Sequence, residues 1–244
     1  MSQAHKIIAV YGNSGSYKTS TSVSLAKAIM KKDKNANVVV VGLDASEPLI
    51  PILFPHNKDI NSIGKLLSSE KLDQETILNS VIINDKISIL GYNSGENKNS
   101  YAFPTESRTD DFLMQMRHLY NYTIIDCTSD VVANKLTAKT LINADNVIYL
   151  LSCDVKGLTF FNSQEPILLS EQYGYRHYWR YLTINGRFIP DIETMQNAIP
   201  QIRGVIPYSE KLPVQWNNGE GLKPLSDSGY NNVVDEIAAA IMEE

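Results

Sequence analysis

Runs of apolar residues that alternate with helical segments are the feature of this sequence that most narrows its fold. Seven short runs rich in Val, Ile, Leu and Tyr are typical of strands, at Lys6–Tyr11, Val38–Leu43, Ile87–Leu90, Tyr122–Asp126, Asn146–Leu151, Arg180–Ile184 and Gly204–Pro207. Several are nearly continuous, as in strands that helices cover on both faces. Segments typical of helices follow them, at Ser20–Lys32, Thr105–Leu119, Ala133–Ile142, Leu158–Glu171, Asp191–Ala198 and Asn231–Met242.

This alternation predicts an α/β fold, with a mostly parallel, doubly wound sheet of about seven strands flanked by helices. The length of 244 residues suits one domain of this kind, and we expect residues 1–244 to form it. Residues 91–104 match neither pattern and are predicted to form a surface loop. The alternative, a linker between domains, is weaker because the segments on both sides resemble parts of one sheet.

The charge and the hydropathy exclude several classes of function. The net charge of −5 gives no support to broad nucleic-acid binding, which depends on neutralising phosphates. A local basic patch at Lys31, Lys32 and Lys34 remains an alternative, although a solvated helix end explains it as well. No apolar stretch approaches the length of a transmembrane segment. Because the first strand begins near residue 6, we expect no signal peptide and a cytoplasmic protein.

The cysteines and histidines show no metal-ligand spacing. Cys127 and Cys153 each follow an apolar run, which predicts buried free thiols rather than a disulfide. The four histidines are scattered along the chain.

A glycine- and serine-rich loop between the first strand and the first helix indicates phosphate binding. In the pattern G-x-x-x-x-G-K-[ST], backbone N–H groups and a helix N-terminus surround the phosphates, the lysine bridges the β- and γ-phosphates, and the hydroxyl binds Mg²⁺. The residues at these positions are Gly12, Asn13, Ser14, Gly15, Ser16, Tyr17, Lys18 and Thr19. Only Tyr17 departs from the pattern, where glycine is expected, and we expect its ring to point outward.

Two later strands end in aspartates. Asp44 and Asp126 stand at the carboxyl ends of apolar runs, where ligands bind in open α/β sheets. An aspartate after an apolar strand is typical of the Walker B motif, which holds Mg²⁺. A turn cap is the alternative interpretation of Asp44.

Taken together, these motifs resemble the ParA/MinD family of P-loop ATPases, to which the nitrogenase iron protein also belongs. The family loop reads G-K-G-G-x-G-K-T, and Gly12, Gly15, Lys18 and Thr19 stand at matching places. The segments 42–46 (GLDAS), 181–186 (YLTING) and 204–222 are similar to later family motifs, in the same order.

The resemblance implies ATP and Mg²⁺ as ligands and assigns roles to individual residues. It makes Lys18 and Asp44 catalytic and gives Thr19, Asp44 and Asp126 to the metal. It also implies nucleotide contacts at Gly12, Asn13, Ser14, Gly15, Ser16, Tyr17, Lys18, Thr19, Ser20, Asn185, Pro207 and Tyr208, the last three beside the base.

Several residues depart from the family pattern. Asn13 replaces the signature lysine that, in the family, reaches the partner's phosphates, and Ser14 and Tyr17 replace glycines. The segment after Asp126 reads C-T-S-D rather than x-P-x-G. These changes predict slow or absent hydrolysis with nucleotide binding retained.

Three functions remain open, and the first is favoured: an ATP-dependent switch that closes as a homodimer and positions a cargo such as plasmid, secretion, pilus or conjugation machinery. The second is a non-catalytic scaffold of the same family, and the third is a small-molecule ligase or kinase of the superfamily. Membrane anchoring by residues 231–244 is disfavoured, because this segment is acidic. We expect it to dock on the domain's own sheet and the cargo to be a protein assembly.

Overall fold

The computed structural model describes residues 5–56, 60–171, 173, 178–187 and 191–244. Its strands form one eight-stranded sheet in the order β3-β4-β2-β5-β1-β6-β7-β8, in which only the β3–β4 pair is antiparallel. The strands are β1 Lys6–Gly12, β2 Val38–Gly42, β3 Ile82–Asn84, β4 Ile87–Leu90, β5 Tyr122–Asp126, β6 Asn146–Ser152, β7 Tyr178–Thr183 and β8 Ile202–Ile206.

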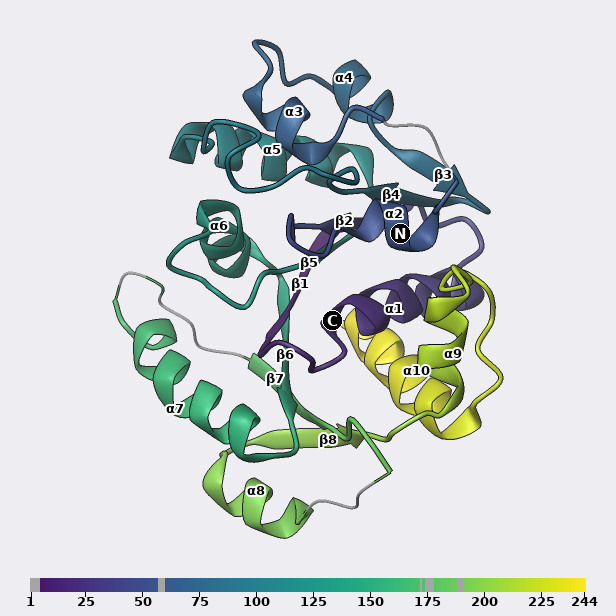
Figure 1. Ribbon diagram of the computed structural model, residues 1–244, viewed down its shortest axis with the longest axis vertical. Coiled ribbons are helices and arrows are strands. Elements are labelled where there is room, and N and C mark those ends of the chain that lie inside the picture. The colour runs from purple at the N-terminus through teal and green to yellow at the C-terminus, as the bar shows by residue number, and fades with distance from the viewer. Residues whose placement is uncertain (1–4, 57–59, 172, 174–177, 188–190) are drawn as a thin grey trace.

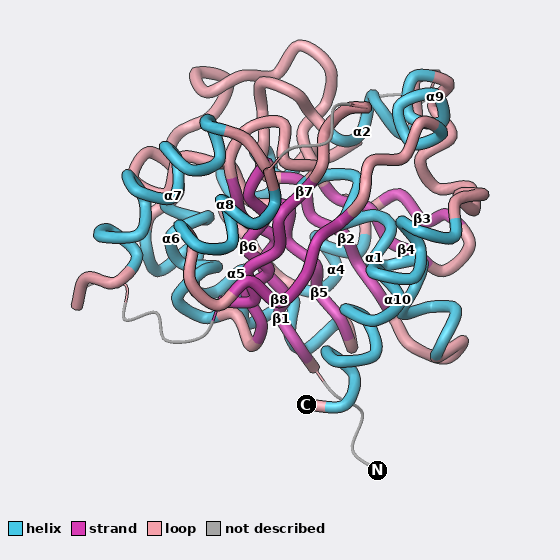
Figure 2. The backbone as a smooth tube through the Cα atoms, turned by 90° about the horizontal axis from the view of Figure 1, so that it is seen from below, coloured by secondary structure: helices cyan, strands magenta, loops and turns pink. Residues whose placement is uncertain are grey.

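Helices connect the strands and cover the sheet on both faces (Figure 1). They are α1 Lys18–Lys32, α2 Leu49–Leu53, α3 Ile63–Ser68, α4 Gln74–Leu78, α5 Glu106–Leu119, α6 Lys135–Asn143, α7 Val155–Leu168, α8 Ile192–Ala198, α9 Lys211–Asn217 and α10 Ser228–Glu243. Helices α5, α6 and α7 lie on one face, and α1 and α10 on the other; Figure 2 shows the strands between these layers from a second direction.

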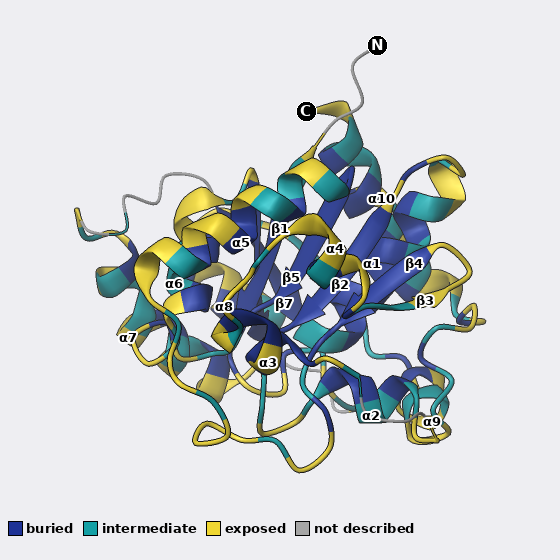
Figure 3. Cartoon of the chain, turned by 90° about the horizontal axis from the view of Figure 1, so that it is seen from above, coloured by how far each residue is buried: buried dark blue, intermediate teal, exposed yellow. Residues whose placement is uncertain are grey.

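The side chains of β1 alternate between two apolar cores, one on each face of the sheet. Ile7, Ala9 and Tyr11 pack with α5, α6 and α7, whereas Ile8 and Val10 pack with α1 and α10. The central strands are buried throughout, and exposure is concentrated in outer helices and loops (Figure 3). The near-continuous apolar runs of the sequence therefore reflect strands that are covered on both sides.

The predicted fold class is confirmed, and the differences lie in short elements. Strand β3 and helices α2, α3, α4 and α9 were not predicted, because three to seven residues are too few to show a period. The β3–β4 hairpin turns at Asp85 and Lys86, whose φ angles are 47° and 79°, without the glycine that usually marks such a turn. Residues 91–104 form a loop, as predicted.

The C-terminal helix α10 packs on its own domain. Its buried residues Tyr230, Val234, Ile237 and Ile241 face α1 and β8, and Lys31 forms an ion pair with Asp235 at 2.7 Å. The predicted docking of this segment is therefore confirmed. Among the described residues, no helix has the length and apolar character needed to cross a membrane.

Candidate functional site

The loop between β1 and α1 packs tightly against the neighbouring strand β6. A Cβ atom at Gly12 would lie 1.9 Å from the carbonyl oxygen of Leu150, so only glycine fits there. Gly15 has a φ of 78°, in the left-handed region that glycine adopts without strain. At both positions that match the phosphate-loop pattern, the backbone conformation or the close packing therefore favours glycine.

Tyr17 has a left-handed backbone conformation, which glycine adopts more readily. Its φ and ψ are 60° and 23°, a left-handed conformation that costs a residue with a side chain about 1–2 kcal/mol. The ring is partly buried in the core on the α1 side, next to Tyr208 and Tyr230, and burial raises its pKa to about 12. The ring is therefore half-buried against its own chain and also lines the open cavity described below, so the expectation of an outward ring stays a prediction.

The N-terminus of α1 is open to an anion. Tyr17 gives no side-chain cap to this helix, and its first turn holds no acidic residue. By contrast, a side-chain cap opens each of the other described helices except the short α2 and α9. The first-turn N–H groups of α1 have no partner within the helix and carry the positive end of its dipole, so they can bind phosphate oxygens.

Lys18 begins α1 and points back over the loop. Its Nζ donates hydrogen bonds to the carbonyl oxygen of Asn13 at 3.1 Å and to Ser129 Oγ at 2.9 Å. Burial lowers its pKa, while the nearby carboxylates of Asp126 and Asp44 act in the opposite direction. Lys18 forms no direct ion pair with any described residue, so this partly buried ammonium has electrostatic capacity left for an anionic ligand.

Thr19 and Asp126 meet beside this lysine and suit a hard cation. The Thr19 hydroxyl lies close to the Asp126 carboxylate and lowers its pKa, but burial is the larger effect and raises the pKa of that carboxyl to about 6. One carboxylate oxygen, Asp126 Oδ1, is buried and has no hydrogen-bond partner among the described residues. One or two protein oxygens completed by phosphate and water oxygens are the usual environment of Mg²⁺, so these residues fit that ion.

Asp44 lies at the rim of the same site. Its Oδ1 accepts hydrogen bonds from the backbone N–H groups of Ser46 at 2.8 Å and Glu47 at 3.3 Å. Asp44 therefore caps the turn that follows it, as the alternative interpretation predicted. The residue also lines the cavity described below, so the cap fixes its carboxylate at the site.

The Asn13 side chain is buried and turned into its own chain. Asn13 Nδ2 donates to Ser152 Oγ at 2.9 Å, and Asn13 Oδ1 accepts from the Ser152 N–H at 2.9 Å. Ser152 Oγ in turn donates to Asp154 Oδ1 at 2.7 Å, and the same oxygen caps α7 through the Gly157 N–H. Asn13 thus ties the loop to the end of β6 and the start of α7.

A cavity of about 610 Å³ opens over these residues. Of the predicted site residues, it is lined by Ser14, Gly15, Tyr17, Lys18, Thr19, Ser20, Asp44 and Asp126. Gly12, Asn13 and Ser16 are buried and do not line the cavity. One cavity therefore brings together the phosphate loop and both strand-end aspartates.

The three residues predicted beside the base lie outside this cavity. Asn185 and Pro207 follow neighbouring strands, since the Ile184 N–H donates to the Ile206 carbonyl at 3.0 Å. Tyr208 lies near the Tyr17 ring, which also lines the cavity. Of these three residues, Tyr208 is thus the one that the structure links to a residue of the cavity wall.

Part of the cavity wall and a hydrogen-bond acceptor of Lys18 were not predicted from the sequence. The wall includes aromatic residues from the 91–104 loop and α9, namely Tyr101, Phe103 and Trp216. Ser129 holds the Lys18 ammonium, although its only sequence signal was its position after Asp126. Loop positions of this kind carry no periodic pattern that would single them out.

Comparisons with known proteins agree with this geometry. The family model AAA_31, described as an AAA domain, matches residues 5–162. A comparison with curated protein sequences gives no match.

Solved structures share the fold over almost the whole chain. A ParA family ATPase from Chlorobium tepidum TLS superposes with a TM-score of 0.78 and 13% identity, over 97% of this chain and 99% of the other. The septum site-determining protein MinD of Pyrococcus horikoshii OT3, complexed with Mg-ADP, gives 0.74 and 16%, over 97% and 95%. Cyanthece McdA gives 0.69 and 18%, over 96% and 98%. The chain therefore belongs to the AAA domain family AAA_31 and is a P-loop protein with the fold of the ParA/MinD ATPases.

Proposed function

We propose that this protein is an ATP-binding molecular switch of the ParA/MinD type, and that residues 1–244 act as one nucleotide-binding domain. The observation that carries the proposal is the meeting of Lys18, Thr19 and Asp126 in one cavity at the uncapped N-terminus of α1. A partly buried ammonium and free helix N–H groups attract phosphate, while an unpaired carboxylate oxygen attracts the accompanying cation.

ATP·Mg²⁺ is the ligand that this set of groups fits best. Lys18 would contact the β- and γ-phosphates, and Thr19 and Asp126 would hold Mg²⁺, with Asp44 close enough to orient a water. The Mg-ADP bound to the similar MinD of Pyrococcus horikoshii supports this assignment. The base would lie toward Asn185, Pro207 and Tyr208, beyond the Tyr17 ring.

Slow or absent hydrolysis follows from the contacts of Asn13. An arginine finger, which places a cation near the γ-phosphate, increases the rate of hydrolysis by a factor of about 10³–10⁵. Asn13 is neutral, and its carboxamide is occupied by Ser152 within the same chain. This residue therefore offers no charge to a partner subunit, which supports a switch that turns over slowly.

The finer parts of the proposal concern partners. We infer a cytoplasmic homodimer that closes around ATP and acts on a protein assembly, such as secretion, pilus or conjugation machinery, or on a plasmid. The net charge of −5 favours the protein assembly over nucleic acid. If the strained Tyr17 loop binds no nucleotide, the scaffold function takes the place of the switch.

Calorimetric titration with ATP and Mg²⁺, paired with native mass measurement, tests the proposal. Wild-type protein should bind ATP·Mg²⁺ and shift toward a dimer, and Lys18→Ala should abolish binding. Lys32→Ala removes the same charge from the other end of α1 and should bind as wild type does. Equal affinity of wild type and Lys18→Ala, or no binding by either, would leave only the scaffold function.

A further inference from the structure

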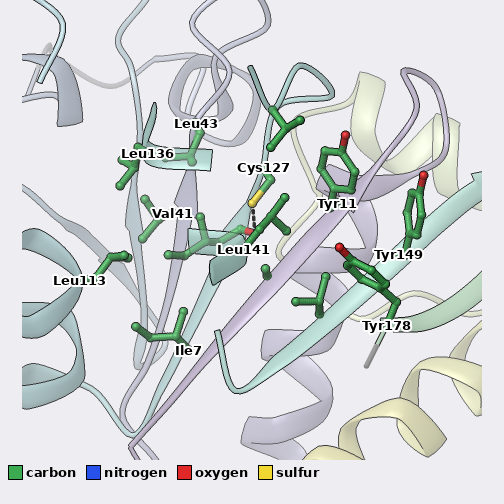
Figure 4. Packing of buried hydrophobic residues seen from close by; sticks show 14 of the residues in the cluster. Ile7, Tyr11, Val41, Leu43, Leu113, Cys127, Leu136, Leu141, Tyr149 and Tyr178 are labelled. Atoms are coloured by element: carbon green, nitrogen blue, oxygen red, sulfur yellow. Dashed lines mark hydrogen bonds between the residues drawn. The ribbon is translucent and has the colours of Figure 1, made fainter. Parts of the chain in front are cut away.

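A buried tyrosine links the phosphate loop to the opposite layer of helices. Tyr11 lies at the end of β1 in an aromatic cluster, with its ring centroid 5.3 Å from Tyr149 and 5.7 Å from Phe160. Figure 4 shows the rings of Tyr11, Tyr149 and Tyr178 side by side in this cluster. An aliphatic or phenyl side chain would serve packing alone, so the hydroxyl of Tyr11 requires a separate explanation.

The Tyr11 hydroxyl connects two polar segments that are distant in the sequence. Its single hydrogen is shared between two acceptors, the carbonyl oxygen of Ser129 at 3.2 Å and Gln164 Oε1 on α7 at 3.0 Å from the hydroxyl oxygen. Burial raises the pKa of Tyr11, and Cys127 and Asp130 raise it further, so the hydroxyl keeps its proton and remains a donor.

The same Ser129 receives the Lys18 ammonium on its side-chain oxygen, at 2.9 Å. A chain of contacts, Lys18–Ser129–Tyr11–Gln164, therefore runs from the phosphate loop to the middle of α7. It passes through the covalent structure of Ser129, because Lys18 contacts the side-chain oxygen and Tyr11 the carbonyl oxygen. We call this chain the tyrosine relay. Any anion that draws the ammonium toward itself competes with Ser129 for that ammonium.

A second connection reaches the start of the same helix. Asn13 holds Ser152, and Ser152 holds the carboxylate of Asp154 that caps α7. Lys18 and Asn13 are thus connected to α7 by separate routes, Lys18 to its middle at Gln164 and Asn13 to its start at Asp154.

We propose that Tyr11 is a positioning residue that couples the Lys18 ammonium to helix α7. Phosphate bound at Lys18 would release Ser129 and thereby change the hydrogen bond between the Tyr11 hydroxyl and Gln164 of α7. The phosphate part rests on the proposed nucleotide binding, whereas the coupling itself exists in the nucleotide-free protein. Exposed apolar residues stand at both ends of α7, Val155 at 79% exposure at its start and Leu169 at 58% just beyond its end. A shift of α7 would therefore move apolar side chains on the protein surface.

Amide hydrogen exchange of α7, followed by mass spectrometry on nucleotide-free protein, tests the coupling. Lys18→Ala and Tyr11→Phe should each raise exchange in the Gln164–Leu168 segment about three- to tenfold, the equilibrium constant of one hydrogen bond. The double variant should exchange no faster than the faster single variant, because both changes break one chain. Gln164→Ala breaks the relay at its other end and replaces Tyr11→Phe if that variant does not fold.

Tyr149→Phe is the matched control. It removes a hydroxyl from the same aromatic cluster, and Tyr149 Oη has no hydrogen-bond partner among the described residues. It should leave α7 exchange as in wild type. Additive effects of Lys18→Ala and Tyr11→Phe, or an effect of Tyr149→Phe equal to that of Tyr11→Phe, would overturn the relay.

Adding ATP·Mg²⁺ or inorganic triphosphate to wild-type protein tests the transmission. Either ligand should reproduce the exchange pattern of Lys18→Ala in α7. Binding measured by calorimetry without a change in α7 would overturn the transmission. Failure of both ligands to bind would refute the proposed nucleotide function, while the double-variant result would still decide the coupling.

Discussion

Asn13 and Ser152 exchange two hydrogen bonds across 139 residues of sequence, one from Asn13 Nδ2 to Ser152 Oγ and one from the Ser152 N–H to Asn13 Oδ1, each of 2.9 Å. The residue at the position of the family's signature lysine therefore holds the loop to β6 in its own chain. Its carboxamide has no spare group to direct at a partner subunit.

Replacing Asn13 with lysine should destabilise the protein and leave turnover low. The ammonium would enter a buried position, and Ser152 would lose both hydrogen bonds, at a cost of about 2 kcal/mol or more in the free energy of unfolding. Urea unfolding and phosphate release measure the two effects. Ser152→Ala, which keeps the backbone N–H, should cost less than Asn13→Lys. A stable Asn13→Lys protein with strongly increased hydrolysis would contradict this interpretation.

Wild-type hydrolysis should remain well below ordinary enzyme turnover. The transition-state charge on the γ-phosphate lacks the compensating cation that Asn13 replaces, and Tyr17 and the segment after Asp126 also depart from the family. Steady-state phosphate release at saturating ATP·Mg²⁺ measures the rate, with Lys18→Ala as the background. A turnover of many per second would refute the prediction.

Replacing Tyr17 with glycine should tighten nucleotide binding modestly and leave the fold unchanged. Glycine adopts a φ of 60° without the penalty of about 1–2 kcal/mol, and it removes a ring that lines the cavity. Calorimetry and crystals soaked with nucleotide provide the measurements. Tyr17→Phe keeps both the strain and the ring and should match wild type. If phosphate binds only to Tyr17→Gly, the natural loop is blocked and the protein works through surface contacts.

The raised pKa of Asp126 predicts how stability varies with pH. Because the carboxyl has a pKa of about 6 in the folded protein and 3.8 as its ordinary value, the folded state binds more protons than the unfolded state between these values. Stability from this group therefore rises as the pH falls, by about 1 kcal/mol from pH 7 to pH 5. Urea unfolding of wild type and Asp126→Asn at both values measures it. An equal pH dependence of the two proteins would show that Asp126 does not titrate in this range.

The ion pair of Arg180 and Glu165 should be essential for stability. Arg180 is 5% exposed on β7 and contacts Glu165 on α7, with aromatic rings of Phe161 and Tyr178 beside it. Glu165→Gln leaves the buried guanidinium without its counter-charge and should cost about 3 kcal/mol in the free energy of unfolding. Asp110→Asn, which breaks an exposed ion pair with Lys139, should leave that free energy unchanged. Equal effects of the two substitutions would contradict the prediction.

The sequence by itself determined the fold class, the phosphate loop and the positions of Asp44 and Asp126 at strand ends. These features depend on local properties: apolar runs buried on both faces, a left-handed glycine, and a lysine and threonine at the start of a helix. Each can be recognised within about ten residues, and the carboxyl ends of parallel strands necessarily share one edge of the sheet.

Only the tertiary structure decided where the side chains of the unusual residues point. Asn13 meets Ser152 because β1 and β6 are neighbours in the sheet, and Tyr11 meets Gln164 because α7 lies on the face to which Tyr11 points. Tyr17 is half-buried because its ring packs near Tyr230 on α10, which follows it by more than 200 residues. Such contacts depend on strand order and helix packing, which are set by burial over the whole chain and leave no signal in the spacing of neighbouring residues.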